Sequence, residues 1–347
     1  MKKWLIIILA LAASTWFLVL PGAVGLIVSD RIEAWLNESA ATAESRFESG
    51  WFSSRLALED RVLAADLEAR HVPPTRLGWL QVSGTMELPQ LPQGSRLDGF
   101  IHIDGRTRVA LESPRFDASG PTRTTLEAPR LSFEQTPTGQ TDVDLEATGL
   151  GLSNTSGLAL DYAGLKIELQ RSPVDDTASR LALGLRLGAA SDPQSLSMAL
   201  VAAPVDDTFF DQLVDGIGQL SRARPDSYDA QLAMLTLAGA WAGLAEAGLV
   251  IDLEHFALGD GSEMEGRWET AAGQPRIIGS GRAEALLEFL NRIVALSRGQ
   301  SPALAEPEAR AWIRTLVERS LLTIDGERFR VAYPSGVEGG STSADSG

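Results

Sequence analysis

The chain has 347 residues, no cysteine and a formal net charge of −16. Without cysteine, disulfides, thiolate metal sites and cysteine nucleophiles are all excluded. The acidic balance argues against binding of nucleic acid, because neutralising phosphates requires a basic surface, and against general adhesion to anionic lipid headgroups. With 44% hydrophobic residues the chain can bury a substantial core, and its length allows one large domain or two smaller ones.

The N-terminus carries an uncharged stretch from Trp4 to Ser29, preceded by two lysines. A helix of about 20 apolar residues spans a hydrocarbon core of about 30 Å, and lysines beside a span favour the cytoplasmic side. Residues 1–29 are therefore predicted to be a membrane anchor in which Trp4, Trp16 and Phe17 suit an interfacial or buried apolar setting. Everything after the anchor is expected on the far side of the membrane.

A cleaved secretory signal peptide is the competing interpretation of this stretch. Ala23, Val24 and Gly25 offer small residues spaced as at a cleavage site. Against cleavage, the stretch is long for a signal peptide and runs directly into apolar residues at helical spacing. We therefore expect an uncleaved signal-anchor that continues into an anchor-proximal helix over residues 30–50.

The dominant hydrophobic period is two from Trp51 to about residue 201. Residues 142–147, 165–170, 180–187 and 195–200 each alternate apolar and polar side chains. Such alternation is typical of antiparallel strands with one apolar and one polar face. The early strands are therefore expected to form a sheet with a long apolar face. That face must be covered by later helices, by curling of the sheet or by a non-protein ligand.

Helical spacing takes over after residue 207. One helix is predicted to begin with Thr208 as its N-cap, and a second covers Ser227 to Ala247. Strands return at residues 249–281, followed by two further helices and a closing hairpin with Asp325-Gly326 as a type I′ turn.

The stretch Gln231 to Ile251 holds a single charge, Glu246, and needs separate comment. Its apolar content is largely Ala and Gly, and no basic cluster flanks it. Because Ala and Gly contribute little to membrane insertion, the stretch is interpreted as a buried helix rather than a second span.

These elements predict an α+β fold, in which an N-terminal membrane helix is followed by a large antiparallel β-rich domain with later packing helices. The β-rich exported domain is expected over residues 51–333, with its helices after 207. Residues 334–347 are dominated by Ser and Gly and are predicted to form a disordered tail.

A five-residue motif opens the first alternating run: Gly50, Trp51, Phe52, Ser53 and Ser54. It resembles the Gly-Trp-Phe-Ser-Ser signature of the YdgA-like family, bacterial envelope proteins of unknown function with an N-terminal membrane anchor. Residues 321–330 are similar to the closing segment of that family. The family's His-Gly-Pro element and its additional closing strand with an Asn-Gly pair are missing here. The motif is interpreted as a packing corner, with part of a docking surface as the alternative.

The resemblance implies an envelope protein, which together with the anchor predicts a single-pass inner-membrane protein with its C-terminal domain in the periplasm. It supplies no catalytic residues. The expected architecture also has a looser similarity to AsmA-like envelope proteins, which pair an N-terminal anchor with a curled sheet whose apolar groove handles lipid.

Candidate chemistry is sparse. His102 and Asp104 share a predicted strand face and could begin a metal site or an acid–base pair, but spacing indicates no third ligand. His255 follows Leu253 on an apolar face, and His71 is interpreted as a loop residue. No Gly-x-Ser-x-Gly elbow, P-loop or His-Glu-x-x-His motif is present. The sequence therefore predicts no catalytic, cofactor-binding or metal-binding residues, and no enzyme.

The leading hypothesis is a non-enzymatic envelope protein that binds lipid or a protein partner through its apolar strand face. The alternative is a structural or assembly factor of the cell envelope with a closed core, and a hydrolase using His102 and nearby carboxylates is a remote third. The expected partners are the inner membrane and either lipid or an envelope protein, with no nucleic acid.

Overall fold

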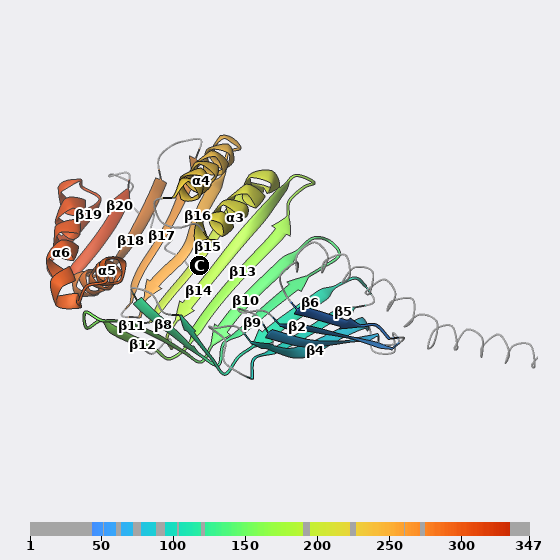
Figure 1. Ribbon diagram of the computed structural model, residues 1–347. Coiled ribbons are helices and arrows are strands. Elements are labelled where there is room, and N and C mark those ends of the chain that lie inside the picture. The colour runs from blue at the N-terminus through green and yellow to red at the C-terminus, as the bar shows by residue number, and fades with distance from the viewer. Residues whose placement is uncertain are drawn as a thin grey trace, which may run out of the picture. The chain divides into compact units, whose positions relative to one another are not determined.

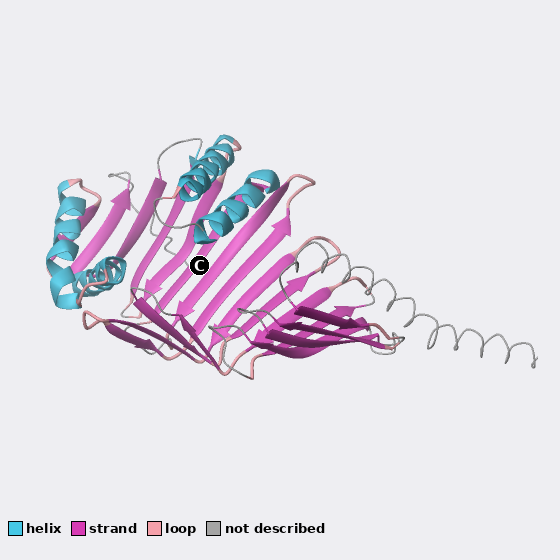
Figure 2. Cartoon of the chain, in the orientation of Figure 1, coloured by secondary structure: helices cyan, strands magenta, loops and turns pink. Residues whose placement is uncertain are grey.

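The structure is a computed structural model that describes residues 44–50, 52–59, 64–71, 78–87, 94–102, 104–118, 122–189, 195–222, 227–259, 261–270 and 275–333. Antiparallel strands dominate it, with four α-helices among the described residues, which confirms the predicted β-rich α+β class (Figure 1, Figure 2). The predicted anchor with Trp4, Trp16 and Phe17, and the predicted tail over 334–347, lie outside the described residues.

None of the described helices is both long enough and apolar enough to cross a membrane.

The chain divides into two compact units. Unit 1 comprises Met1–Ser119 and Thr124–Leu150, and unit 2 comprises Gly120–Arg123 and Gly151–Gly347. All four described helices belong to unit 2: α3 (Asp207–Arg222), α4 (Tyr228–Glu246), α5 (Ala283–Arg298) and α6 (Pro302–Glu318).

Unit 1 is built on an antiparallel sheet in which most sequence neighbours pair. The strand order is β1-β2-β3-β4-β5-β6-β9-β10. The bounds are Glu44–Glu48 (β1), Ser53–Glu59 (β2), Ala64–His71 (β3), Gly78–Glu87 (β4), Arg96–His102 (β5), Thr107–Glu112 (β6), Arg130–Gln135 (β9) and Thr141–Ala147 (β10). Two further strands, β7 (Arg115–Ala118) and β8 (Thr122–Glu127), form a short antiparallel pair. The predicted period of two is confirmed in this unit.

The predicted anchor-proximal helix over residues 30–50 is wrong at its C-terminal end. Its last described residues form β1, in which Phe47 lies opposite Leu56 of β2. The helical signal there was local and short, and burial against a neighbouring strand outweighs it. Gly50 consequently links two strands instead of ending a helix, and a Cβ at Gly50 would come within 2.5 Å of the Ser53 carbonyl oxygen.

Unit 2 repeats the antiparallel arrangement and adds helices. Its main strands lie in the order β13-β14-β15-β16-β17-β18-β20-β19. The bounds are Leu165–Pro173 (β13), Ala178–Leu187 (β14), Leu196–Asp206 (β15), Val250–Leu258 (β16), Ser262–Glu269 (β17), Pro275–Arg282 (β18), Leu322–Asp325 (β19) and Arg328–Tyr333 (β20). Two short strands, β11 (Gly149–Asn154) and β12 (Ala159–Tyr162), lie next to each other in a smaller sheet.

The helices of unit 2 pack on parts of its sheet and leave much of β13 and β14 without a helix over them (Figure 2). Beneath α3 and α4, Val205 at the end of β15 packs with Leu244 and Leu249, and Phe209 of α3 joins the same cluster. Beneath α5, Phe329 of β20 is buried with side chains from both α5 and α6. The expectation of later packing helices is therefore confirmed for this unit.

The first of these helices begins two residues earlier than predicted, because its N-cap is Asp206 rather than Thr208. α3 starts at Asp207, and the Asp206 carboxylate accepts hydrogen bonds from the backbone N–H of Thr208 (3.0 Å) and of Phe209 (3.2 Å). Thr208 therefore lies inside the helix. Asp206, two residues before it, already accepts hydrogen bonds from the free N–H groups of the first turn. The second helix, α4, agrees closely with the predicted Ser227–Ala247, and the Ser227 hydroxyl accepts from the Ala230 N–H at 3.1 Å.

Candidate functional site

One cross-strand row of apolar residues runs through every strand of the unit 1 sheet. Its members are Phe47, Leu56, Leu67, Gly84, Leu97, Leu111, Leu131 and Leu145. Because cross-strand partners project to the same side of a sheet, these residues share one face. At about 4.8 Å between neighbouring strands, this leucine row extends for roughly 34 Å.

A second apolar row lies beside the first on the same face. It consists of Val82, Gly99, Val109, Phe133 and Val143, from β4 to β10. Next along the strands comes a short polar row of Thr107, Gln135 and Thr141. We call the leucine row and this valine row together the apolar face of unit 1.

The apolar face is incompletely buried. Leu131 is 41% exposed, whereas Leu56 near the β1 edge is 9% exposed, and most of the other large members are half-buried. The cluster around Leu56 draws only on side chains of the first three strands. Since the described residues of unit 1 contain no helix, no described helix of its own unit covers this face.

The opposite face of the same sheet is charged and internally paired. The Arg55 guanidinium makes a two-pronged ion pair with the Asp66 carboxylate, and Arg70 Nε donates to Glu68 at 3.1 Å. The hydrogen bond from Arg55 holds the pKa of Asp66 below its ordinary value, and Arg70 does the same for Glu68. Both carboxyl groups are therefore anions with a partner.

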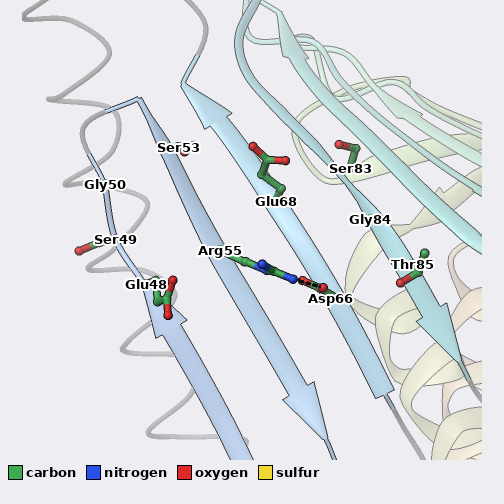
Figure 3. Close-up of a pocket in the computed structure, with 10 residues that line it drawn as sticks. All are labelled: Glu48, Ser49, Gly50, Ser53, Arg55, Asp66, Glu68, Ser83, Gly84 and Thr85. Atoms are coloured by element: carbon green, nitrogen blue, oxygen red, sulfur yellow. Dashed lines mark hydrogen bonds and ion pairs between the residues drawn. The ribbon is translucent and has the colours of Figure 1, made fainter.

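A shallow pocket of about 740 Å³ opens on this charged face (Figure 3). It is lined by Glu48, Ser49, Gly50, Ser53, Arg55, Asp66, Glu68, Ser83, Gly84 and Thr85. Figure 3 shows the Arg55–Asp66 ion pair across the pocket. A general acid at neutral pH needs a raised carboxyl pKa, and here the pKa of Asp66 and of Glu68 is lowered. Asp66 and Glu68, each paired with an arginine, are therefore poorly suited to act as general acids. The described residues hold no cluster of three potential metal ligands.

The described motif residues lie at the start of β2, beside the end of β3. Ser54 is buried, and its Oγ lies 3.3 Å from Nε2 of the equally buried His71. The Phe52 carbonyl accepts the backbone N–H of His71 at 2.8 Å, while the Phe52 side chain is half exposed. Gly50 and Ser53 line the pocket described above, and Trp51 lies outside the described residues. The contacts of Ser54 are those of a packing corner.

The interpretation of His71 as a loop residue is wrong. His71 is the last residue of β3, lies opposite Leu80 of β4 and is 2% exposed. The Val-Pro-Pro sequence that follows signalled a strand end, and the strand continues for one residue more than that signal indicated.

His102 and Asp104 do not form a site on a shared strand face. His102 is the last residue of β5. Its ring packs edge-on against the Phe100 ring, with 4.7 Å between the ring centroids. Asp104 lies in the following turn, where its Oδ1 accepts the Arg106 N–H at 3.0 Å. The carboxylate is thus committed to the turn rather than to the histidine.

The placement of His255 on an apolar face is also wrong. A register shift between Leu253 and Phe256 interrupts the alternation in β16. His255 consequently lies opposite Ala199, is exposed, and its Nε2 lies 3.0 Å from the Ser197 hydroxyl. A β-bulge has no clear single-sequence signal and changes the side to which residues point.

A second apolar surface lies on α4, which was predicted to be buried. Ala233, Ala240 and Leu244 on its inner side are fully buried. The exposed residues, which we call the α4 outer face, are Tyr228, Leu232, Met234, Leu235 and Trp241. The prediction of a buried helix is therefore correct for one side of α4 only.

No family model, no curated protein and no solved structure matches this chain. The resemblance to the YdgA-like family is carried by the residues quoted above and stays a prediction. The function must accordingly be argued from the two apolar surfaces.

Proposed function

We propose that the protein is a non-enzymatic, membrane-anchored envelope protein that binds the acyl chain of a lipid on the apolar face of unit 1. The observation that carries the proposal is the continuous leucine row with Leu131 left 41% exposed. Soluble proteins rarely expose contiguous apolar patches larger than a few hundred Å² unless something binds there. The apolar face is roughly 34 Å long across the strands, and most of its large members are half-buried rather than buried, which makes it a candidate for such a binding surface.

The composition of this face favours an acyl chain over a protein partner. A protein interface carries about one hydrogen bond per 100–200 Å², and the two apolar rows supply no polar side chain. The backbone groups of the inner strands are already paired in the sheet. An acyl chain has no hydrogen-bonding groups and requires only apolar contact, which this face provides.

A polar row beside the apolar rows fits the headgroup of the same lipid. Thr107 and Thr141 flank Gln135 on the side of the valine row away from the leucines. Their hydroxyl and amide groups can donate and accept hydrogen bonds. An amphiphile whose tail follows the leucine row would place its polar end here or in solvent.

The location belongs to the same proposal. It rests on the uncharged stretch Trp4–Ser29 behind two lysines and on the family-like motif, which together indicate a single-pass inner-membrane protein with both units in the periplasm. A lipid-binding face on a membrane-anchored protein would lie close to the lipids that it binds.

A structural or assembly factor is the second candidate. The observation that favours it is the helix-covered sheet of unit 2, in which Val205 and Phe329 are almost fully buried. Such a factor would hold no lipid in unit 1, which gives the test its alternative outcome.

The test compares two neighbouring substitutions on β9 in the full chain. Leu131→Asn places an amide in the leucine row, and Ser132→Asn places the same amide on the opposite face, since side chains alternate along a strand. Native mass spectrometry of both proteins, released from phospholipid nanodiscs, measures the lipid that stays bound. The anchor is identical in the two variants, so its lipids cancel in the comparison.

Leu131→Asn is expected to lower lipid occupancy about tenfold, because removing one large apolar contact costs about 1.5 kcal/mol or more. Ser132→Asn is expected to retain the lipid. Equal occupancy in both variants, with β9 equally protected from hydrogen exchange, would overturn the proposal and favour the structural factor.

A further inference from the structure

Unlike the other described helices, α4 has no charged side. Between Asp229 and Glu246 it carries no charged residue. The outward sides of the others do, with Asp211 and Asp215 on α3, Glu288 on α5 and Arg310 on α6. A helix that is apolar on all sides is normally buried on all sides. We therefore expect the exposed side of α4 to contact another molecule or a membrane.

The side chains of the α4 outer face are large and well exposed. Tyr228 is 76% exposed and Leu235 is 70% exposed, and Leu232, Met234 and Trp241 are each at least 40% exposed. They extend from the first turn of the helix to its last third. With Tyr228 near one end and Trp241 towards the other, the face carries amphipathic rings at both ends.

Close packing on the inner side prevents this face from turning inward. A Cβ at Gly243 would come within 2.4 Å of the Phe209 ring, and one at Gly216 within 2.9 Å of the Leu237 side chain. The helix pair α3–α4 is therefore in contact along its length, and α4 cannot rotate about its axis without clashes. Trp241 is further fixed by the Trp268 ring, 5.7 Å away between centroids.

The polar content of the outer face argues against a protein partner. From Tyr228 to Ala245 the side chains that could form hydrogen bonds to a partner are few: Tyr228, Asp229, Gln231, Thr236 and the indole of Trp241. The Thr236 hydroxyl already donates to the Leu232 carbonyl at 3.1 Å. Protein interfaces combine an apolar centre with a polar rim and about ten hydrogen bonds. This face lacks the rim, whereas a bilayer interface requires apolar contact and amphipathic aromatic rings.

We propose that the α4 outer face lies in the interfacial region of the bilayer in which residues 1–29 are expected to be anchored. Its 19 residues are about 28 Å long, and the helix would lie in the plane of the membrane with its inner side on unit 2. An anchor in the same chain holds the face at a high effective concentration near the bilayer. The inference needs the anchor but not lipid binding by unit 1.

The charge of the surroundings narrows the kind of lipid surface. α4 has no basic residue, and the neighbouring α3 carries the acidic residues Asp207, Asp211 and Asp215. Contact therefore relies on apolar burial rather than on anionic headgroups. Zwitterionic phosphatidylcholine is the matching surface, and added anionic lipid should not strengthen the contact.

The absence of cysteine makes a site-specific test direct. Leu235→Cys and, as the control on α6, Arg314→Cys each give the full chain a single thiol for an environment-sensitive fluorophore. Leu235 is well exposed and Arg314 is also exposed, so both labels should be tolerated. The chains are reconstituted into phosphatidylcholine vesicles that contain a nitroxide-bearing lipid. The fluorophore at position 235 is expected to emit at shorter wavelength and to lose roughly half or more of its intensity, as an interfacial helix would.

The control label at position 314 is expected to keep its intensity and a water-like emission. Equal quenching at the two positions, or no quenching at 235, would overturn the inference. If the label at position 235 is not quenched and unlabelled Leu235→Cys chains, in a parallel sample, form disulfide-linked dimers on oxidation, a second copy of the chain occupies the face. Failure of this test leaves the Leu131→Asn result untouched, so the two proposals are separable.

Discussion

Units 1 and 2 both contain an antiparallel sheet with one apolar face, but they treat that face differently. In unit 2, helices bury Val205 to 2% and Phe329 to 1% exposure. Away from those helices, apolar strand positions are mostly half-buried in both units, such as Leu183 and Leu185 in unit 2, and in unit 1 Leu131 reaches 41% exposure. The same alternation of side chains thus lies under helices in part of unit 2 and under no described helix of its own unit in unit 1. On our proposal, the helix-covered part of unit 2 supplies stability and the apolar face of unit 1 binds the ligand.

The largest contrast is expected from removing one phenylalanine in each unit. Phe329→Ala should destabilise unit 2 by about 3–5 kcal/mol, because it leaves a cavity under α5. Phe133→Ala, on the half-buried valine row of unit 1, should cost clearly less, since the residue has less area to lose. Hydrogen exchange with mass spectrometry, read separately for β20 and β9, measures each effect. Similar losses in the two units would show that the apolar face of unit 1 is a closed core.

A smaller contrast comes from adding a methyl group at a strand glycine. Gly279→Ala would place a Cβ 2.8 Å from the Glu263 carbonyl oxygen and 2.3 Å from the Met264 side chain, which should cost about 1–3 kcal/mol. Gly99→Ala on unit 1 meets nothing closer than 3.5 Å and should be neutral or stabilising by about 0.5 kcal/mol. Local exchange rates of β18 and β5 distinguish the two. A destabilising Gly99→Ala would contradict an open valine row.

The smallest effect concerns the charged face of unit 1 and its response to acid. Arg55 lowers the pKa of Asp66 in the folded chain. The ion pair therefore stabilises unit 1 above the pKa of an unfolded aspartate, about 3.9, and this contribution is lost as the pH falls through the lowered folded value. Because both side chains are well exposed, the effect should be slight.

Asp66→Asn tests this sign. Relative to the unchanged chain at the same pH, the variant should lose protection in β2 and β3 at about pH 6, and the difference should shrink as the pH falls below about 3.9. A difference of equal size at both pH values would mean that the ionisation of Asp66 is not its cause.

Much of the strand and helix pattern could be predicted from the sequence, because the hydrophobic period reports directly which side of an element is buried. The alternation over 142–147 became β10, and the helical spacing after Thr208 became α3. The errors occurred where local signals compete with tertiary contacts. β1 is a strand because Phe47 pairs with Leu56, and His255 changes face because of a bulge that no residue type announces.

The candidate surfaces could be predicted less well. The sequence indicates an apolar strand face, but it does not indicate that Leu131 is exposed whereas Val205 is buried with Leu244 of α4. The exposed side of α4 could not be predicted from the sequence either. Leu235 and Leu244 are both apolar residues in a helix without charges in its middle, and yet Leu235 is exposed and Leu244 is buried. Periodicity identifies apolar sides, and the fold decides which are covered.

The central claim is that lipid acyl chains lie on the apolar face of unit 1. It is tested most directly by reconstituting the full chain with a phospholipid that carries a photoreactive group on its acyl chain and mapping the adducts by mass spectrometry. The account predicts adducts at Leu131 and Phe133 of β9 and none at Ser132 or Glu134, an alternation that only a lipid lying on one face produces. Adducts absent from β9, or spread over both faces, would contradict it.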